Sequence, residues 1–218
     1  MEENLKNYTT TNNNNFVEKI SEPVRTKYLP LKRLFDIVFG TLLFIPSSVV
    51  ILVFMILVRW ETPGKCFYSQ KRVGLMGKPI VVTKLRSMYS NAESKSGAIW
   101  AKKNDDRITK VGHFMRKTRI DELPQLLSVI KGDMSLIGPR PERPQFTEEF
   151  SHEYPGFEQR LRIKPGLSGY AQVHGGYDID PGEKAQLDRY YIDNIDLKLD
   201  IQIFKDTIKI VITGDGAR

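Results

Sequence analysis

The sequence predicts an α/β protein that is mainly helical, with a kinked, re-entrant membrane helix near its N-terminus and a small cytoplasmic domain that contains a short β-hairpin. Three observations carry this prediction. Residues 37–58 form a run of 22 residues without a charge. Residues 66–73 and 79–86 have the composition of strands on either side of a glycine-containing turn. Residues 122–130 and 198–212 carry apolar side chains at the spacing of one helix face.

The uncharged run is long enough to cross a hydrocarbon core of about 30 Å as a helix. Buried helices of soluble domains are seldom this long and apolar on every side. Pro46 lies near the middle of the run, where proline removes a helical N–H, and the hydroxyls of Ser47 and Ser48 can satisfy freed backbone groups. Lysines and arginines flank both ends, and such flanks favour the cytoplasmic face. We therefore expect a membrane kink at Pro46 and Ser47 that returns the chain to the same face, with a straight span as the alternative.

Three segments are expected along the chain. Residues 1–30 form a polar arm whose centre, residues 9–15, contains only threonine and asparagine, a composition typical of disorder. The acidic start of this arm and its lack of an apolar stretch exclude a secretory signal. Residues 31–60 contain the membrane helix, and residues 61–218 form the cytoplasmic domain.

Within the cytoplasmic domain, residues 74–78 are expected to form the turn between the two strands, and the polar residues 90–107 a mobile loop. Helices are expected over 109–118, 122–130, 183–194 and 198–212. The last of these has an apolar face formed by Ile201, Phe204, Ile208 and Val211.

The charge and cysteine content limit the partners and the chemistry. The formal net charge of +7 suggests an acidic partner such as anionic lipid, a phosphorylated substrate or nucleic acid, although a basic soluble surface would give the same balance. No basic motif interleaved with aromatic residues is present, so nucleic acid is not expected. Cys66 is the only cysteine, which excludes an intrachain disulfide and fits a reducing compartment. The three histidines are scattered, so a metal is expected to be a hard cation held by carboxylates and phosphate.

The adjacent acids Asp121 and Glu122 are the first candidates for chemistry. Asp121 stands where an N-cap residue is expected, and Pro124 falls in the first helical turn. A positive helix end and the basic residues that precede the pair would stabilise the carboxylates and attract phosphates. A carboxylate can attack phosphorus, and its neighbour can help to bind a divalent cation. From local spacing alone, an ordinary cap followed by a solvated glutamate is the more common arrangement.

Cations elsewhere are candidates for phosphate binding. Arg140 lies between Pro139 and Pro141, which hold it in a defined place, and its planar fork suits a bidentate phosphate contact. Lys84 and Arg86 alternate along a predicted strand and should share a face. The alternatives are a turn with a surface arginine and two solvated strand residues.

Five motifs, in order behind the apolar run, resemble one family closely. The chain is similar to bacterial sugar transferases, which are monotopic phosphoglycosyl transferases that act on polyprenol phosphate, over residues 31–212. The motifs are Lys32-Arg-Leu-Phe-Asp36, Lys84-Leu-Arg-Ser-Met88, Asp121-Glu-Leu-Pro-Gln125, Lys131-Gly-Asp-Met-Ser-Leu-Ile-Gly-Pro-Arg-Pro141 and Lys164-Pro-Gly-Leu-Ser-Gly169.

The resemblance implies that a nucleotide diphosphate sugar, usually a UDP-sugar, gives its sugar-1-phosphate to undecaprenyl phosphate while UMP leaves. The family's nucleophile falls on Asp121, which would form a covalent phosphosugar adduct. Glu122 falls on the acid that assists metal binding or deprotonation of the acceptor. Mg²⁺ is the expected cofactor, with Asp121 and Glu122 as its ligands. Further active-site positions of the family fall on Lys84, Arg116, Arg140 and Asp200.

The resemblance also implies a re-entrant helix with both ends in the cytoplasm, and therefore a catalytic domain on the cytoplasmic face of a bacterial inner membrane, acting in the first membrane step of exopolysaccharide or capsule synthesis. The expected partners are a UDP-sugar, undecaprenyl phosphate and membrane lipid. Downstream glycosyltransferases and a second copy of the chain are further candidates. The chain departs from the family in having Pro46 before its serines, and Gly175-Gly-Tyr177 where some relatives carry an arginine. A non-catalytic membrane-bound scaffold or regulator on the same fold is the alternative function.

Overall fold

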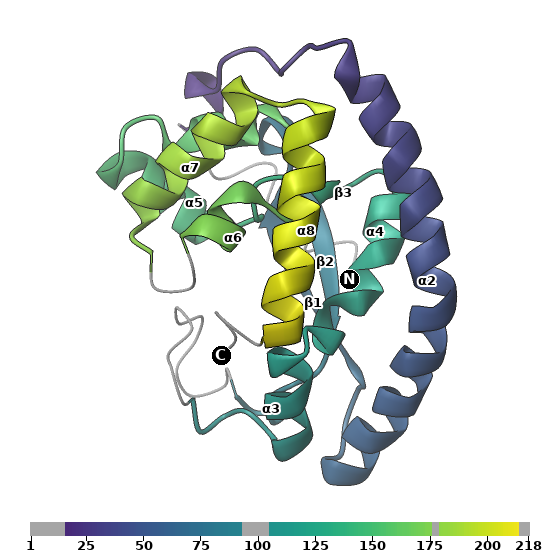
Figure 1. Cartoon of the computed structure of the whole chain (residues 1–218). Coiled ribbons are helices and arrows are strands. Elements are labelled where there is room, and N and C mark those ends of the chain that lie inside the picture. The colour runs from purple at the N-terminus through teal and green to yellow at the C-terminus, as the bar shows by residue number, and fades with distance from the viewer. Residues whose placement is uncertain (1–15, 93–104, 176–178, 214–218) are drawn as a thin grey trace.

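A long helix dominates the computed structural model, which describes residues 16–92, 105–175 and 179–213. Helix α2 (Tyr28–Glu61) has 34 residues and runs along one side of the molecule (Figure 1). It ends where Thr62 becomes extended, as expected for a residue that precedes a proline. Its apolar window has a mean hydropathy of 2.7 and is 11% buried, and α2 is the one helix in the described ranges that is long and apolar enough to cross a membrane. The predicted long apolar helix is confirmed.

Pro46 does not interrupt α2. The residues on both sides of it remain helical, and the hydroxyl of Ser48 donates to the carbonyl oxygen of Ile45 at 2.6 Å. In Figure 1 the helix follows a smooth curve around the rest of the chain, and its two ends lie at opposite ends of the molecule. The sharp reversal at Pro46 and Ser47, with both ends on the cytoplasmic side of a bilayer, stays a prediction.

The predicted disordered arm is corrected over residues 16–30, while residues 1–15 lie outside the described residues. The Phe16 side chain is buried with Val73 and Leu161. The backbone N–H of Ser21 donates to Gln159 and that of Val24 donates to Arg162. Because the apolar side chains here are few and set among polar ones, composition predicted disorder where long-range packing gives order.

The predicted β-hairpin is confirmed. Strands β1 (Phe67–Val73) and β2 (Pro79–Leu85) are antiparallel, with Phe67 opposite Leu85 and Val73 opposite Pro79. The short helix η2 (Leu75–Gly77) forms the turn. Leu85 packs with Met115 against the inner side of α2, which fixes the end of β2 relative to the long helix.

The four helices predicted after α2 are present, with one change. Helices α3 (Lys110–Lys117), α7 (Pro181–Asp193) and α8 (Leu197–Thr213) lie close to their expected ranges. The helix expected over 122–130 is a 3₁₀ helix, η3 (Ile120–Gln125), followed directly by α4 (Leu126–Lys131). Most of the expected loop 90–107 lies outside the described residues.

The sequence analysis missed several short elements. They are η1 (Val17–Lys19), α5 (Pro144–Glu153), η4 (Phe157–Arg162), α6 (Tyr170–His174) and the strand pair β3 (Ser135–Ile137) and β4 (Gly166–Ser168). β3 and β4 are parallel, and their contact requires glycine, because a Cβ on Gly166 would lie 2.1 Å from the backbone nitrogen of Gly138. This close approach places residues 138–142 beside the loop that precedes β4.

Helix α8 turns its predicted apolar face outward. Ile201, Phe204 and Ile208 are exposed, whereas Asp200 and Ile203 are buried on the inner face. Ile203 packs in a core cluster with Ile137 of β3 and Tyr191 of α7. Helix α8 therefore packs on the rest of the chain through the face that carries Asp200 and Ile203.

Candidate active site

The two adjacent acids lie in the first turn of η3, directly after a strained residue. Arg119 occupies the N-cap position in the left-handed region, with φ of 59°, and its carbonyl oxygen accepts from the N–H of Glu122 at 3.1 Å. Asp121 is therefore inside the turn and not its N-cap, which corrects the prediction. Asp121 is 6% exposed and Glu122 is 8% exposed, so an ordinary cap with a solvated glutamate is also wrong.

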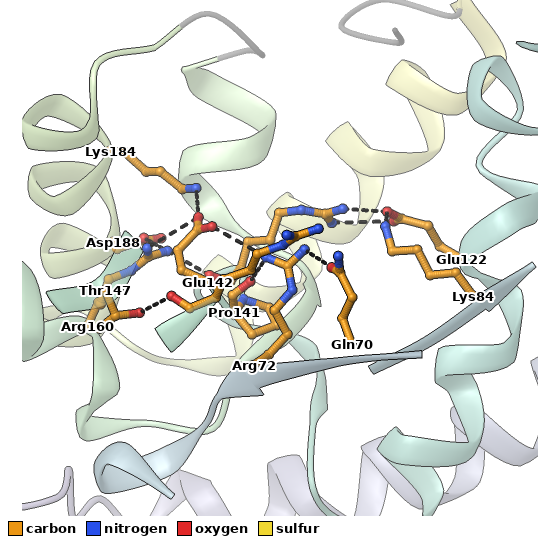
Figure 2. Close-up of polar contacts among 12 residues, drawn as sticks. Gln70, Arg72, Lys84, Glu122, Pro141, Glu142, Thr147, Arg160, Lys184 and Asp188 are labelled. Atoms are coloured by element: carbon orange, nitrogen blue, oxygen red, sulfur yellow. Dashed lines mark hydrogen bonds and ion pairs between the residues drawn. The ribbon is translucent and has the colours of Figure 1, made fainter. Parts of the chain in front are cut away.

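Glu122 is neutralised by two cations. Its Oε1 lies 2.5 Å from Lys84 Nζ on β2 and 2.5 Å from an Arg140 guanidinium nitrogen (Figure 2). Burial raises the pKa of Glu122, but the charges of Arg140 and Lys84 outweigh burial and hold this pKa well below its usual range. Glu122 is therefore the member of the pair whose ionised form its surroundings favour.

Asp121 has the opposite environment. Within the described ranges, no group donates a hydrogen bond to its carboxylate. Burial raises the pKa of Asp121, and the negative charge of Glu122 raises it further, against the opposing charges of Lys84 and Arg116. A buried carboxylate without a donor keeps its lone pairs available for a reaction partner.

Three of the predicted cations surround the pair. Lys84 and Arg140 touch Glu122, and their side chains are 23% and 28% exposed, so both can also reach a bound ligand. Arg116 on α3 donates from Nε to the hydroxyl of Ser87 at 2.9 Å, and its charge acts on Asp121. The acid pair therefore lies near three cations, two of them in contact with Glu122, which suits a substrate with several phosphate oxygens.

The structure places Arg86 elsewhere, which corrects its assignment to phosphate binding. Its guanidinium donates to the carbonyl oxygens of Thr62 and Pro63 at 2.9 and 2.7 Å, and to the Thr62 hydroxyl at 2.8 Å. Arg86 is buried, so it ties the end of β2 to the end of α2.

Asp200 is also placed away from the acid pair. Its carboxylate accepts from Lys32 at 2.6 Å, from Tyr28 at 2.7 Å and from Tyr191 at 2.8 Å. These contacts join α8 to the beginning of α2 and to α7. The expectation that Asp200 binds substrate is corrected to a structural role for the described contacts.

The carboxylates of the acid pair could hold a magnesium ion together with substrate phosphates, and this cofactor stays a prediction. No group of three or more metal-ligating side chains is found in the part of the chain that the structure describes. Mg²⁺ usually needs only one or two carboxylates together with substrate phosphates. The Asp121 carboxylate accepts no hydrogen bond from the described residues, and Glu122 Oε2 has a long 3.4 Å contact to Arg140, so both have ligand capacity.

A family model for bacterial sugar transferases matches residues 27–214. The chain belongs to the bacterial sugar transferase family. This match confirms the resemblance expected from the five motifs and extends over all of α2 and nearly all of the residues that follow it.

Three relatives are named for one acceptor, undecaprenyl phosphate, and for two sugars. A putative undecaprenyl-phosphate N-acetylgalactosaminyl 1-phosphate transferase of Bacillus subtilis is 58% identical, covering 67% of this chain and 84% of its own length. A UDP-N-acetylgalactosamine-undecaprenyl-phosphate N-acetylgalactosaminephosphotransferase of Aeromonas hydrophila is 43% identical, covering 88% of this chain but 46% of its own length. An undecaprenyl-phosphate galactose phosphotransferase of Salmonella typhimurium is 39% identical, covering 86% of this chain and 41% of its own length.

The sequence analysis missed a second polar cluster behind the Arg140 turn. It contains Glu142, Arg72, Arg160, Lys184 and Asp188 (Figure 2). In the sequence of this bacterial sugar transferase, Glu142 directly follows the Gly-Pro-Arg-Pro motif. That position was the sequence signal that could have pointed to Glu142. Its partners come from three other elements, so local spacing did not reveal them.

Proposed function

We propose that this chain transfers a sugar-1-phosphate from a UDP-sugar to undecaprenyl phosphate and releases UMP. The observation that supports this most strongly is the contrast inside the acid pair, where Glu122 is neutralised by Lys84 and Arg140 while the buried Asp121 carboxylate has no donor within the described residues. The relatives' names supply the acceptor and the type of donor.

In the first step, an oxygen of the Asp121 carboxylate attacks the β-phosphorus of the UDP-sugar. The bond from this phosphorus to the bridging oxygen breaks, and UMP leaves with that oxygen and the electron pair. Lys84, Arg116 and Arg140 balance the charge of the diphosphate and reduce its repulsion of the incoming carboxylate. The product on the enzyme is an acyl phosphate that carries the sugar.

In the second step, an oxygen of undecaprenyl phosphate attacks the same phosphorus. The acyl phosphate bond breaks, the Asp121 carboxylate is restored, and undecaprenyl diphosphate sugar forms. Glu122 holds Lys84 and Arg140 in place. Asp121 and Glu122 would hold Mg²⁺, which would neutralise diphosphate charge.

The exposed apolar surface of α2 supports a membrane location for this reaction, because the acceptor is a lipid. We place the catalytic domain on the cytoplasmic face of the inner membrane, where its UDP-sugar would be available. Labelling of single cysteines introduced near residues 25 and 62, in a Cys66→Ser background, tests the re-entrant geometry. Both labels should be accessible from the cytoplasm, whereas opposite faces would show a straight span.

A UMP-release screen over several UDP-sugars with undecaprenyl phosphate tests the activity. UDP-N-acetylgalactosamine is the first donor to try, because two of the relatives carry its sugar in their names. A donor labelled at the β-phosphate should leave label covalently attached to the wild-type protein when the acceptor is omitted. Absence of UMP release with every donor would favour a non-catalytic scaffold.

A further inference from the structure

The turn that carries Arg140 points charged side chains in two directions. Arg140 contacts Glu122, which also binds Lys84. Glu142, two residues later, points toward Lys184, away from Glu122 and Lys84 (Figure 2). Glu142 is buried and contacts Lys184 closely, with Arg72 and Arg160 each at 3.6 Å. Residues 140–142 therefore connect the candidate active site to the second polar cluster.

Two arginines of this second cluster bind the backbone of the turn. An Arg160 guanidinium nitrogen donates to the carbonyl oxygen of Arg140 at 2.9 Å, and one of Arg72 donates to the carbonyl oxygen of Pro141 at 3.2 Å. Arg160 is itself fixed, because its side chain is 3% exposed and lies 2.6 Å from the carboxylate of Asp188. These donors come from η4 and β1, which are distant in sequence from the turn.

The two hydrogen bonds to carbonyl oxygens fix the backbone from which the Arg140 side chain extends. Pro139 and Pro141 fix φ on each side of Arg140, but they leave the peptide planes free to rotate about ψ. The hydrogen bond from Arg160 to the carbonyl oxygen of Arg140 restricts the rotation about ψ of Arg140. Arg140 is the residue whose guanidinium must reach Glu122. Small displacements of a group that binds the reacting phosphate lower rates strongly, by as much as about 100-fold for roughly 1 Å.

We propose that Arg160 and Arg72 are positioning residues that hold Arg140 in the geometry needed to bind the diphosphate of the substrate. Asp188 and Glu142 fix these two arginines. The proposal rests on the proposed function, since it assigns Arg140 to the phosphates of that reaction. Lysine cannot replace either arginine fully, because each guanidinium uses two nitrogens. In Arg160 one nitrogen donates to the Arg140 carbonyl oxygen and the other faces Glu142. In Arg72 one nitrogen donates to the Pro141 carbonyl oxygen and the other donates to Gln70.

The test is a double-mutant cycle on kcat/KM for the UDP-sugar. We expect Arg160→Lys and Arg72→Lys each to lower kcat/KM about 10-fold in the wild-type background. In an Arg140→Lys background, the same changes should cost less than about twofold, because the fork that they position is already gone. A merely structural role would give the same fold-loss in both backgrounds, and that result would overturn the proposal.

Arg162→Lys is the matched control. Arg162 lies in the same helix as Arg160 and also donates to a backbone carbonyl oxygen, that of Glu22 at 2.9 Å, in a different segment. It should change kcat/KM by less than about twofold. A loss as large as that of Arg160→Lys would also overturn the proposal.

Binding of UDP by calorimetry separates this proposal from the proposed function. If the wild type releases no UMP with any donor, the proposed function fails, but the cycle can be run on the dissociation constant for UDP. Non-additive losses there would still support the positioning role, and additive losses would reject it. Arg72 is partly exposed, so Arg72→Lys keeps the test available if Arg160→Lys does not fold.

Discussion

The two polar clusters on either side of residues 140–142 contain similar groups in different states. In the cluster of Lys84, Asp121, Glu122 and Arg140, the cations are partly exposed, and one acid has no donor within the described residues. In the cluster of Arg72, Glu142, Arg160, Lys184 and Asp188, the most buried pair, Arg160 and Asp188, is 3% and 1% exposed.

This difference indicates that the first cluster is a site for a reaction and that the second cluster holds the first in place. The enclosed pair of Arg160 and Asp188 fixes positions and leaves little room for a ligand, whereas Arg72 at the edge of the same cluster is 21% exposed. A cluster with an unpaired acid and reachable cations is incomplete until a ligand with phosphate oxygens arrives. The comparison therefore predicts that substitutions in the first cluster affect the reaction and those in the second affect mainly stability or geometry.

The largest expected effect is that of Asp121→Asn. The amide cannot form the acyl phosphate, so UMP release should fall by at least about 1,000-fold, with no covalent label from a β-phosphate-labelled donor. Asp193→Asn is the control, because that side chain is exposed and only weakly paired. An active Asp121→Asn protein would remove the nucleophile from the first cluster and the basis of the comparison.

The next effect concerns Glu122→Gln. Loss of the charge that holds Lys84 and Arg140 should lower kcat/KM by roughly 10- to 100-fold. The negative charge of Glu122 raises the pKa of Asp121, so its removal should lower that pKa. Since Asp121 must be ionised to attack, the acidic limb of the pH profile of kcat/KM should move to lower pH in the variant.

The same donor and acceptor are used for both proteins, so that titration of substrate phosphates cancels in the comparison. An acidic limb that does not move would show that it reports a group other than Asp121. The role of Glu122 in raising the pKa of Asp121 would then be wrong.

Much of this arrangement could be predicted from the sequence, because its signals are local. The uncharged run predicted α2, strand alternation predicted β1 and β2, and ordered motifs placed the acid pair with Lys84, Arg116 and Arg140. The position of Asp121 inside the turn was not predicted, since it depends on the positive φ of Arg119, a residue type that rarely adopts it.

The remaining errors concern contacts between residues far apart in the chain. Asp200 pairs with Lys32, 168 residues away, and Glu142 contacts Lys184, 42 residues away. Arg86 turns to the end of α2, which strand alternation alone does not specify. Local spacing shows which face a side chain occupies, but the partner on that face is set by tertiary packing.

For the second cluster, we predict a pH-dependent loss of stability in Glu142→Gln. Burial opposes ionisation of Glu142, but Lys184, Arg160 and Arg72 outweigh it and lower the pKa of Glu142 from 4.5 to about 2. Because the folded pKa is depressed, the stabilisation is complete above about pH 4.5 and is lost as the pH falls toward about 2. The shift corresponds to on the order of 3 kcal/mol at neutral pH.

Urea unfolding of both proteins in detergent between pH 7 and pH 2.5 measures this effect. The difference in free energy of unfolding should be greatest at pH 7 and should shrink below about pH 4.5. A difference that is independent of pH would mean that the carboxylate charge of Glu142 does not stabilise the second cluster.

The smallest effect is expected for Arg86→Lys. Lys84 lies near the end of β2 and Arg86 directly follows the strand, yet Lys84 contacts the acid pair and Arg86 contacts the end of α2. Arg86→Lys should cost roughly 1 kcal/mol of stability through lost backbone contacts and change kcat/KM by less than about threefold. Lys84→Gln, measured in parallel, should lower kcat/KM at least about 10-fold with little change in stability. If instead Arg86→Lys lowers kcat/KM as much as Lys84→Gln does, Arg86 acts on the substrate after all. The boundary of the first cluster would then include the end of β2, as strand alternation suggested.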